Sequence, residues 1–282
     1  MSSDLSRKLK KCIVKTPLLG PVVLLAARLF ILSGYIKHKL YEAGRWLIYS
    51  RETTNFTYKI TPLSRAYLIN LISCITGVST EKMEVYAQEL EKDENLSKHV
   101  HEGTLASNRK IIADEKTHFG RRLGWYLLVR AKKPKIVVET GIDKGLGAIV
   151  LCSAILRNTE DGFPGKYLGL DINPEAGFLL KGTYASVGTI LLGDSAKTIP
   201  TLPTPIDIFI NDSDHSASHE ELEYQLIQGM LSSDSIIIGD NAHCNDRLLR
   251  FSKKTGRNFA FWSEKPEDHW YPGGGIGLSY TN

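Results

Sequence analysis

The stretch VETGIDKGLG, residues 138–147, decides the fold class of this chain. It begins in the apolar run IVVET (136–140) and leads into a second apolar run that starts at Leu146, so a glycine-rich turn joins a predicted strand to a predicted helix. Gly141 allows a tight turn, and Gly145 allows a ligand to approach the backbone closely. A strand, a glycine turn and a helix in this order favour an α/β domain.

The rest of the chain beyond Lys135 repeats this alternation of short apolar runs and helical stretches. Helices are predicted at 146–157 and 218–231, and strands that are apolar on both faces indicate a mostly parallel sheet covered on both sides. The last two strands are joined by the short, turn-rich link 265–274 and predict a hairpin that closes the sheet edge. The sequence therefore predicts a doubly wound, mostly parallel sheet of seven strands: IVVET (136–140), YLGLDI (167–172), TILLGD (189–194), IDIFIND (206–212), SIIIGD (235–240), FAFWSE (259–264) and GIGLSY (275–280).

Three regions are expected along the chain: a basic and apolar helical segment (1–50), a helical lid or extension (51–130) and a ligand-binding catalytic domain (131–282). In the second region, Thr61-Pro62 is expected to start one helix, and Thr80 is expected to cap the next. A further amphipathic helix is predicted from Gly120 to Lys133, and Pro134 would end it.

The segment from Pro17 to Ile36 is nearly apolar, with Arg28 as its one charged residue and lysines on both sides. Its length suits a bilayer span, which needs about 20 residues. A central arginine, however, costs about 2.5–3.5 kcal/mol on insertion scales. Three interpretations stay open: a packing or dimerisation helix, a helix lying on a membrane surface, and a true span.

Composition narrows the function classes. The net charge of +4 supplies too little basic excess to indicate a nucleic-acid partner. The cysteines, Cys12, Cys74, Cys152 and Cys244, form no CxxC pair and therefore suggest neither a disulfide framework nor a zinc site. Reduced thiols fit a cytoplasmic protein, with peripheral membrane association through residues 17–36 as the added possibility.

Acidic residues end several of the predicted strands, at the edge where open α/β sheets bind ligands. Glu139 ends the first strand, where it would repel a pyrophosphate but would suit a cationic ligand. The glycine spacing is not the GxGxxG dinucleotide fingerprint, and GxxxxGK[ST] is absent. These features argue against NAD and ATP as ligands.

In its strand-end motifs the chain resembles the class I S-adenosylmethionine-dependent methyltransferases. VVETGIDKG looks like their first motif, LGLDINP places Asp171 where that family binds the ribose hydroxyls, and Gly193-Asp194-Ser195 resembles the adenine-contacting motif. The fourth strand continues into IDIFINDSDH. The resemblance implies S-adenosylmethionine as cofactor and a Rossmann-like fold, with these cofactor-binding residues: Glu139, Thr140, Gly141, Gly145, Asp171, Asp194, Ser195 and Asp212.

The pairing of NDSDH with GDN is similar to the macrocin-type and catechol-type divalent-metal O-methyltransferases. This resemblance implies that Asp212, Asp240 and Asn241 hold Mg²⁺, with Asp214 as an alternative ligand, and that His215 acts as the base together with Asp212. Carboxylate and amide oxygens are hard donors that suit Mg²⁺. A metal bound there would favour the ionised acceptor oxygen.

Other polar and aromatic residues near the expected site have plainer explanations. Arg109, His118 and Arg121-Arg122 could reach the site from a lid, but solvated helix faces are the favoured explanation. The aromatic residues near the closing hairpin, Trp262, Trp270 and Tyr271, could wall an acceptor pocket or simply be buried by the hairpin.

The predicted function is Mg²⁺-assisted O-methylation of a small molecule, such as a sugar, a glycosylated natural product or a polysaccharide or lipid precursor. A homo-oligomer is expected, and no nucleic-acid partner. Two alternatives stay open: an NAD-dependent sugar-modifying enzyme, and a non-catalytic membrane-surface protein with a vestigial cofactor pocket. A nucleic-acid methyltransferase is disfavoured by the weak net charge.

Overall fold

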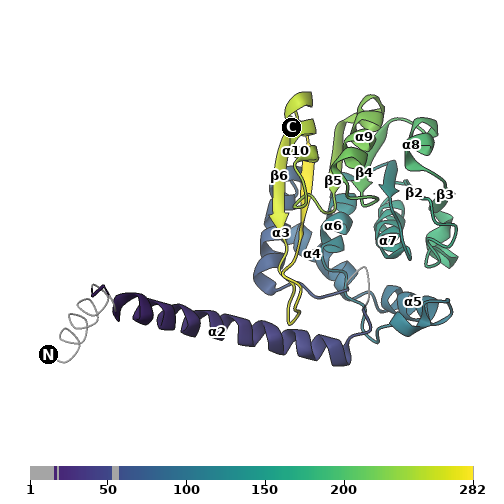
Figure 1. Ribbon diagram of the computed structural model, residues 1–282. Coiled ribbons are helices and arrows are strands. Elements are labelled where there is room, and N and C mark those ends of the chain that lie inside the picture. Colours follow the sequence, from purple (N-terminus) through teal and green to yellow (C-terminus); the bar gives the residue numbers. More distant parts are fainter. Residues whose placement is uncertain (1–15, 18, 53–56, 282) are drawn as a thin grey trace. The chain divides into compact units, whose positions relative to one another are not determined.

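The computed structural model describes residues 16–17, 19–52 and 57–281. The chain divides into two compact units. One comprises residues up to Ser50 together with Asp268–Trp270, and the other comprises Arg51–Glu267 together with Tyr271 onward. The larger unit contains the whole sheet, shown in Figure 1.

The larger unit is built on a seven-stranded sheet with the order β3-β2-β1-β4-β5-β7-β6. The first five strands run parallel, and β7 is antiparallel to both β5 and β6. This confirms the doubly wound, mostly parallel fold and the terminal hairpin. Because β7 inserts between β5 and β6, β6 is the edge strand on that side of the sheet, and β3 is the edge strand on the other. The strands are β1 Ile136–Thr140, β2 Lys166–Asp171, β3 Gly188–Leu192, β4 Ile206–Asn211, β5 Leu231–Gly239, β6 Asn258–Ser263 and β7 Gly275–Tyr280.

Successive side chains of the central strands enter two separate hydrophobic cores, since side chains alternate between the faces of a strand. Val137 belongs to the larger core and Val138 to the smaller one. In β4, Ile208 and Ile210 likewise face the larger core, whereas Phe209 faces the smaller. Both faces are therefore buried, which explains why the strands are apolar at consecutive positions.

Helices cover both faces of the sheet (Figure 1). Buried residues of α3 through α7 share the larger core with the sheet, and those of α9 and α10 share the smaller one. The helices of this unit are α3 Pro62–Thr76, α4 Thr80–Glu91, α5 Glu94–Leu105, η1 Lys110–Ile112, α6 Arg122–Lys132, α7 Leu146–Glu160, η2 Gly182–Ser186, α8 Ser195–Thr198, η3 Ile199–Thr201, α9 Ala217–Ile227, η4 Gln228–Met230 and α10 Arg247–Thr255.

Several predicted helix ends hold, and others shift. Thr61 caps α3 by accepting the backbone N–H of Ser64, as expected. The cap of α4 is Ser79 rather than Thr80, because the Ser79 hydroxyl accepts the N–H of Lys82. The helix predicted over 218–231 ends at Ile227, since the next residues form η4 and Leu231 already belongs to β5.

The helices before β1 form a full layer of the domain. Leu68, Ile72, Met83 and Trp125 are fully buried and belong to the same core as the sheet. Among the described residues of this region, those that line the cavity described below are Asn108, Arg109, Ile111, Ile112, Arg121 and Arg122. This region therefore covers a face of the sheet and contributes a short rim to its edge.

The smaller unit contains one long helix, α2 Leu19–Tyr49. It is long and apolar enough to cross a membrane by length and composition. Near its end, the Trp46 ring lies edge-on to the Trp270 ring with centroids 5.3 Å apart. The side chains of its first half are largely exposed.

Candidate active site

A cavity of about 970 Å³ opens at the carboxyl ends of β1 to β4. Open α/β sheets bind ligands at this edge. The volume lies at the upper end of the range of small-molecule pockets, about 300–1,000 Å³. The predicted site residues on its wall are Glu139, Gly141, Asp171, Asp194, Ser195, Asp212, Asp214, His215 and Asn241; Thr140, Gly145 and Asp240 are not among its lining residues.

The glycine turn after β1 requires glycine for steric reasons. Gly141 has φ +79°, and a Cβ there would lie 2.1 Å from the carbonyl oxygen of Asp212. Gly145 has φ +92°, and its Cβ would lie 3.1 Å from the Cα of Gly177. Gly141 thus lets the β1 turn approach the β4 loop, whereas Gly145 packs against a neighbouring turn.

Asp171, at the end of β2, holds the glycine turn in place. Its Oδ2 accepts the backbone N–H groups of Ile142 at 2.9 Å and Asp143 at 3.1 Å, and its Oδ1 accepts that of Asn173 at 2.8 Å. Charged acceptors make the stronger backbone hydrogen bonds. The carboxylate is therefore fixed on the cavity wall, where a hydroxylated ligand would meet it.

Glu139 lies at the cavity wall but is almost fully buried. The Tyr167 hydroxyl donates a hydrogen bond to its Oε2. Burial raises the pKa of Glu139 to about 8, against the opposing effect of the Tyr167 hydrogen bond. The carboxyl is thus mostly protonated at neutral pH, and a cation placed beside it would lower this pKa.

The loop after β3 combines a helix cap with a wall of the cavity. Asp194 caps α8, because its Oδ1 accepts the N–H of Ala196 at 3.0 Å. The Ser195 hydroxyl lies 3.2 Å from the Nε2 of His219. Both residues also line the cavity. Asp194 therefore caps a helix, as many strand-end aspartates do, and it also lies on the wall of the cavity as predicted.

A buried carboxylate, Glu223 of α9, ties the ends of β1 and β4 together. It accepts hydrogen bonds from the hydroxyls of Thr140 (2.7 Å) and Ser213 (3.0 Å) and from the amide nitrogen of Asn211. His219 Nε2 lies 3.0 Å from Glu223 Oε1, the oxygen that also accepts the Ser213 hydroxyl. The Thr140 side chain is thus committed to this network, which places it behind the cavity wall.

Asp212 and Asp240 lie close together at the ends of β4 and β5. Because Arg121 contacts Asp240, the pKa values of the two carboxyls shift in opposite directions. Arg121 Nε donates to Asp240 Oδ1 at 2.7 Å, its Nη2 contacts Oδ2, and its Nη1 donates to Glu264 Oε1 at 3.0 Å. Burial opposes ionisation of Asp240, yet Arg121 holds its pKa below the ordinary value. Burial and the neighbouring Asp240 raise the pKa of Asp212 well above its usual range.

The favoured explanation of Arg121-Arg122 as a solvated helix face is wrong. The Arg121 side chain is only 15% exposed, and Arg122 is buried. Both line the cavity, as does Arg109, which pairs with Asp143. His118 is not among the lining residues.

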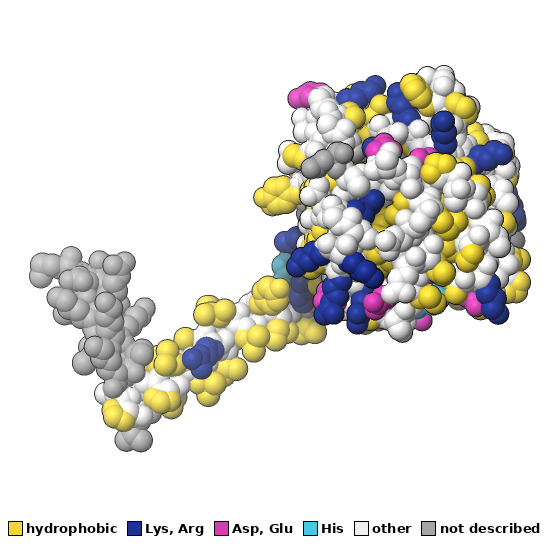
Figure 2. Space-filling model, turned by 90° about the horizontal axis from the view of Figure 1, so that it is seen from above, with side chains coloured by type: hydrophobic (Ala, Val, Ile, Leu, Met, Phe, Trp, Pro, Cys, Tyr) yellow, Lys and Arg dark blue, Asp and Glu magenta, His cyan; other side chains and the backbone are white. Residues whose placement is uncertain are grey.

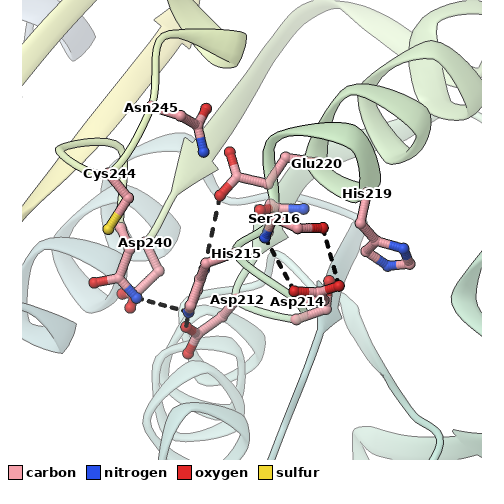
Figure 3. Close-up of polar contacts among 12 residues, drawn as sticks. Asp212, Asp214, His215, Ser216, His219, Glu220, Asp240, Cys244 and Asn245 are labelled. Carbon is pink, nitrogen blue, oxygen red and sulfur yellow. Dashed lines mark hydrogen bonds and ion pairs between the residues drawn. The ribbon is translucent and has the colours of Figure 1, made fainter.

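His215 stands between two carboxylates at the cavity (Figure 3). Its Nε2 lies 2.7 Å from the Nδ2 of Asn241 and 3.6 Å from Asp212 Oδ1. On the opposite side of the ring, Nδ1 lies 3.7 Å from Oε1 of the buried Glu220. A hydrogen bond donated by the Asn241 amide to Nε2 requires the tautomer with its proton on Nδ1.

Asp214, the alternative metal ligand, is directed toward the start of α9 (Figure 3). Its carboxylate accepts the N–H and the hydroxyl of Ser216, each at 3.0 Å. These hydrogen bonds lower the pKa of Asp214. Asp214 therefore acts on the helix start, and Asp212 is the carboxylate beside His215.

The donor set expected for Mg²⁺ lies at the ends of β4 and β5. Asp212, Asp240 and Asn241 offer hard oxygen ligands. Both Asp240 oxygens, however, contact the Arg121 guanidinium, which already neutralises this carboxylate. Within residues 16–17, 19–52 and 57–281, no group of three or more His, Cys, Asp or Glu side chains is placed to hold a metal ion. As arranged, the set does not fit a divalent cation.

Sequence reasoning missed Tyr167, Glu220, Glu223 and Glu264, and undervalued Arg121. Tyr167 lies in β2, Glu220 and Glu223 lie in α9, and Glu264 directly follows β6; no motif marks these positions. Arg121 had one usable signal: it immediately precedes α6, and a cation near a helix N-terminus is unfavourable unless another charge compensates it.

The aromatic residues near the closing hairpin do not wall the cavity. Trp262 is buried, and its Nε1 donates to the carbonyl of Ser64 at 3.1 Å, which ties β6 to α3. The Tyr271 ring packs against the Tyr58 ring at 5.8 Å. The alternative, burial by the hairpin, is what the structure shows for Trp262.

Part of the chain is similar to known methyltransferases. Residues 138–242 match the model of a methyltransferase domain. No curated protein matches the chain. Among solved structures, similarity extends to the O-methyltransferase TomG from Streptomyces achromogenes, solved with S-adenosylmethionine, at 15% identity, a TM-score of 0.49 and coverage of 70% of this chain and 95% of that one.

Two further solved structures are similar. The methyltransferase PaMTH1 from Podospora anserina, bound to S-adenosylhomocysteine, is 16% identical with a TM-score of 0.49, and the match covers 72% of this chain and 94% of that one. An O-methyltransferase from Bacillus cereus in complex with S-adenosylhomocysteine is 13% identical with a TM-score of 0.44, covering 77% and 97%.

The matched residues 138–242 contain the glycine turn, the strand-end acids and His215. The sheet around them is the doubly wound, mostly parallel sheet of seven strands expected from the sequence. Residues 138–242 are therefore similar to a methyltransferase domain, and they lie in a doubly wound, mostly parallel sheet.

Proposed function

We propose that this protein transfers the methyl group of S-adenosylmethionine to a hydroxyl oxygen of a small-molecule acceptor. One observation carries the proposal. One cavity is lined both by the glycine turn with Glu139 and Asp171 and by His215 and Asp212. The first set suits a cationic, ribose-bearing ligand, and the second suits proton removal from a hydroxyl.

In the proposed reaction, His215 accepts the acceptor's proton on Nε2. Glu220 lies beside the other ring nitrogen, Nδ1. It would keep Nδ1 protonated and stabilise the imidazolium that forms. The Nδ2 of Asn241 lies 2.7 Å from Nε2 and orients the imidazole ring at the cavity. Asp212 Oδ1 lies 3.6 Å from Nε2 and is the carboxyl oxygen next to the site of proton transfer.

S-adenosylmethionine supplies an electrophilic methyl group when it is bound. A C–O bond to the acceptor forms as the C–S bond breaks, the bonding pair stays on sulfur, and the hydroxyl proton moves to His215. Asp171 and the glycine turn position the ligand. Alignment of the methyl donor with the acceptor in this way increases the reaction rate.

The metal-assisted form of this reaction is a prediction from the motifs alone. Because Arg121 contacts both Asp240 oxygens, no step above passes through Mg²⁺. We propose that Arg121 provides the fixed positive charge beside Asp212 and Asp240 that a divalent cation would otherwise provide.

The acceptor class proposed from the sequence is a sugar, a glycosylated natural product, or a polysaccharide or lipid precursor. The cavity supports a small acceptor, because its 970 Å³ must hold the cofactor as well. A polymer could present only one terminal unit to it.

Two measurements test the proposal. Calorimetric titration of the protein with S-adenosylhomocysteine should show binding of one ligand per chain, and absence of binding contradicts the cofactor assignment. A panel of hydroxylated acceptors is then screened for transfer of a labelled methyl group, with EDTA and with added Mg²⁺. Equal turnover in both supports the Arg121 assignment, and turnover only with Mg²⁺ contradicts it.

A further inference from the structure

The first half of α2 has no polar face. Val22, Val23, Leu24 and Leu25 are consecutive and therefore cover a complete helical turn, and each is at least 40% exposed. Residues 29–32, Leu-Phe-Ile-Leu, cover a second complete turn and are 51–80% exposed. In Figure 2, hydrophobic side chains cover most of the visible surface of this helix.

A helix that lies on a membrane surface needs a strongly charged face opposite its apolar face. Between Leu19 and Ile36 the single charged residue is Arg28, so no such face exists. A helix that is apolar all round is instead buried in protein or in a bilayer. The two described turns are not buried by the residues of their own unit, so a bilayer is the surrounding that we consider for them.

The length of the apolar part fits the hydrocarbon layer. The 18 residues from Leu19 to Ile36 extend about 27 Å at 1.5 Å per residue, and the hydrocarbon core is about 30 Å thick. Lys37 and Lys39 follow directly, and lysines also precede the segment, so charges flank it on both sides. Lysine side chains at such positions extend to the headgroups.

Arg28 opposes insertion, but the apolar residues outweigh it. On insertion scales one central arginine cancels about seven residues of the Leu, Ile, Val and Phe class. The segment has ten of these: Leu19, Val22, Val23, Leu24, Leu25, Leu29, Phe30, Ile31, Leu32 and Ile36.

The last part of α2 has the composition of a membrane interface. Tyr41 and Trp46 occur there among the charged residues Lys39, Glu42 and Arg45. The Arg45 guanidinium lies 5.9 Å from the Tyr41 ring centroid. Aromatic residues mixed with basic ones are enriched at the headgroup level.

We infer that residues 19–36 are embedded in the hydrocarbon of a phospholipid bilayer and anchor the methyltransferase domain to a membrane. The inference stands on α2 alone and does not depend on the chemistry proposed for the active site.

The test uses the full-length protein, purified in mild detergent and reconstituted with vesicles of pure phosphatidylcholine or of phosphatidylcholine with phosphatidylglycerol. We expect the protein to float with both vesicles in a density gradient and to stay bound in 1 M NaCl. Flotation with the anionic vesicles alone, reversed by salt, would show electrostatic surface binding and overturn the inference.

The paired variants place arginines on different helices. Leu25→Arg with Ile31→Arg puts three arginines in the apolar part of α2 and should abolish flotation. Leu63→Arg with Val85→Arg places two arginines at exposed apolar positions of α3 and α4 and should leave flotation unchanged. Circular dichroism confirms that both proteins are folded, and equal flotation of the two overturns the inference.

Two other outcomes also overturn it. If wild-type protein without detergent is a dimer that fails to float, and the α2 variant is a monomer, then a second copy of the chain covers α2. If intact mass shows that cells release the protein cut after α2, the segment is a removable targeting sequence.

Discussion

Arg121 and Asp240 form a two-point ion pair in which Arg121 Nε lies 2.7 Å from Asp240 Oδ1 and its Nη2 contacts the other oxygen. The Asp240 side chain is fully buried, so this pair is shielded from solvent. The third contact of the guanidinium, to Glu264, joins the end of β5 to the end of β6. One arginine thereby compensates two buried carboxylates.

Removal of Arg121 should destabilise the domain strongly. Arg121→Gln leaves Asp240 and Glu264 buried without their counter-ion, and breaking a buried pair from one side costs about 3–5 kcal/mol. Urea denaturation measures the loss. The control is Arg250→Gln, which breaks an exposed pair with Asp246 and should cost at most about 1 kcal/mol. Equal losses would show that the Arg121 pair is no stronger than a surface one.

Glu139 should make the protein less stable as the pH rises. Burial raises the folded-state pKa of Glu139 to about 8, above its unfolded value of about 4.5, so the folded protein holds its proton more tightly. The free energy of unfolding should therefore fall between about pH 4.5 and pH 8 on account of this group. Glu139→Gln removes this contribution.

Urea denaturation at pH 5, 7 and 9 checks the Glu139 prediction. The difference in unfolding free energy between Glu139→Gln and wild type should shift in favour of the variant as the pH increases. Glu160→Gln, an exposed position on α7, is the control and should show no such trend. A constant difference for Glu139→Gln would mean that its carboxyl titrates normally.

Asp171 should be required for cofactor binding. Asp171→Ala removes the acceptor of three backbone N–H groups and frees the glycine turn, so the affinity for S-adenosylhomocysteine should fall at least about tenfold, or about 1.4 kcal/mol. Calorimetry measures the dissociation constant.

A matched control for Asp171 exists at the opposite edge of the sheet. Asp207 accepts the backbone N–H groups of Lys135 and Ile136, at 2.8 and 3.0 Å. Asp207→Ala should cost stability without weakening ligand binding. Unchanged binding in Asp171→Ala would contradict its assignment to the cofactor.

His215 should affect turnover and leave cofactor binding intact. His215→Gln removes the proton acceptor while keeping a polar side chain, and general-base catalysis contributes about 10²–10⁴-fold. We expect kcat to fall within that range once an acceptor is known, with the same affinity for S-adenosylhomocysteine. His243→Gln, on the exposed loop after β5, should keep full turnover. A normal kcat in His215→Gln would assign the proton to another group.

The sequence alone determined the order of strands and helices, the glycine turn and the acidic strand ends, because these are local patterns of period, length and turn chemistry. Gly141 and Asp171 could be assigned to the ligand edge for the same reason: parallel strands end on one side of a sheet. Asp212 and His215 followed from their place directly after β4.

Only the tertiary structure decided which charges meet. Arg121 and Asp240 are 119 positions apart, and Glu264 is a further partner from another strand. Their contact depends on how α6 packs over the sheet and on the insertion of β7 between β5 and β6. No local pattern encodes such long-range packing, so the sequence indicated a metal ligand at Asp240 where the structure shows a carboxylate already paired with a guanidinium.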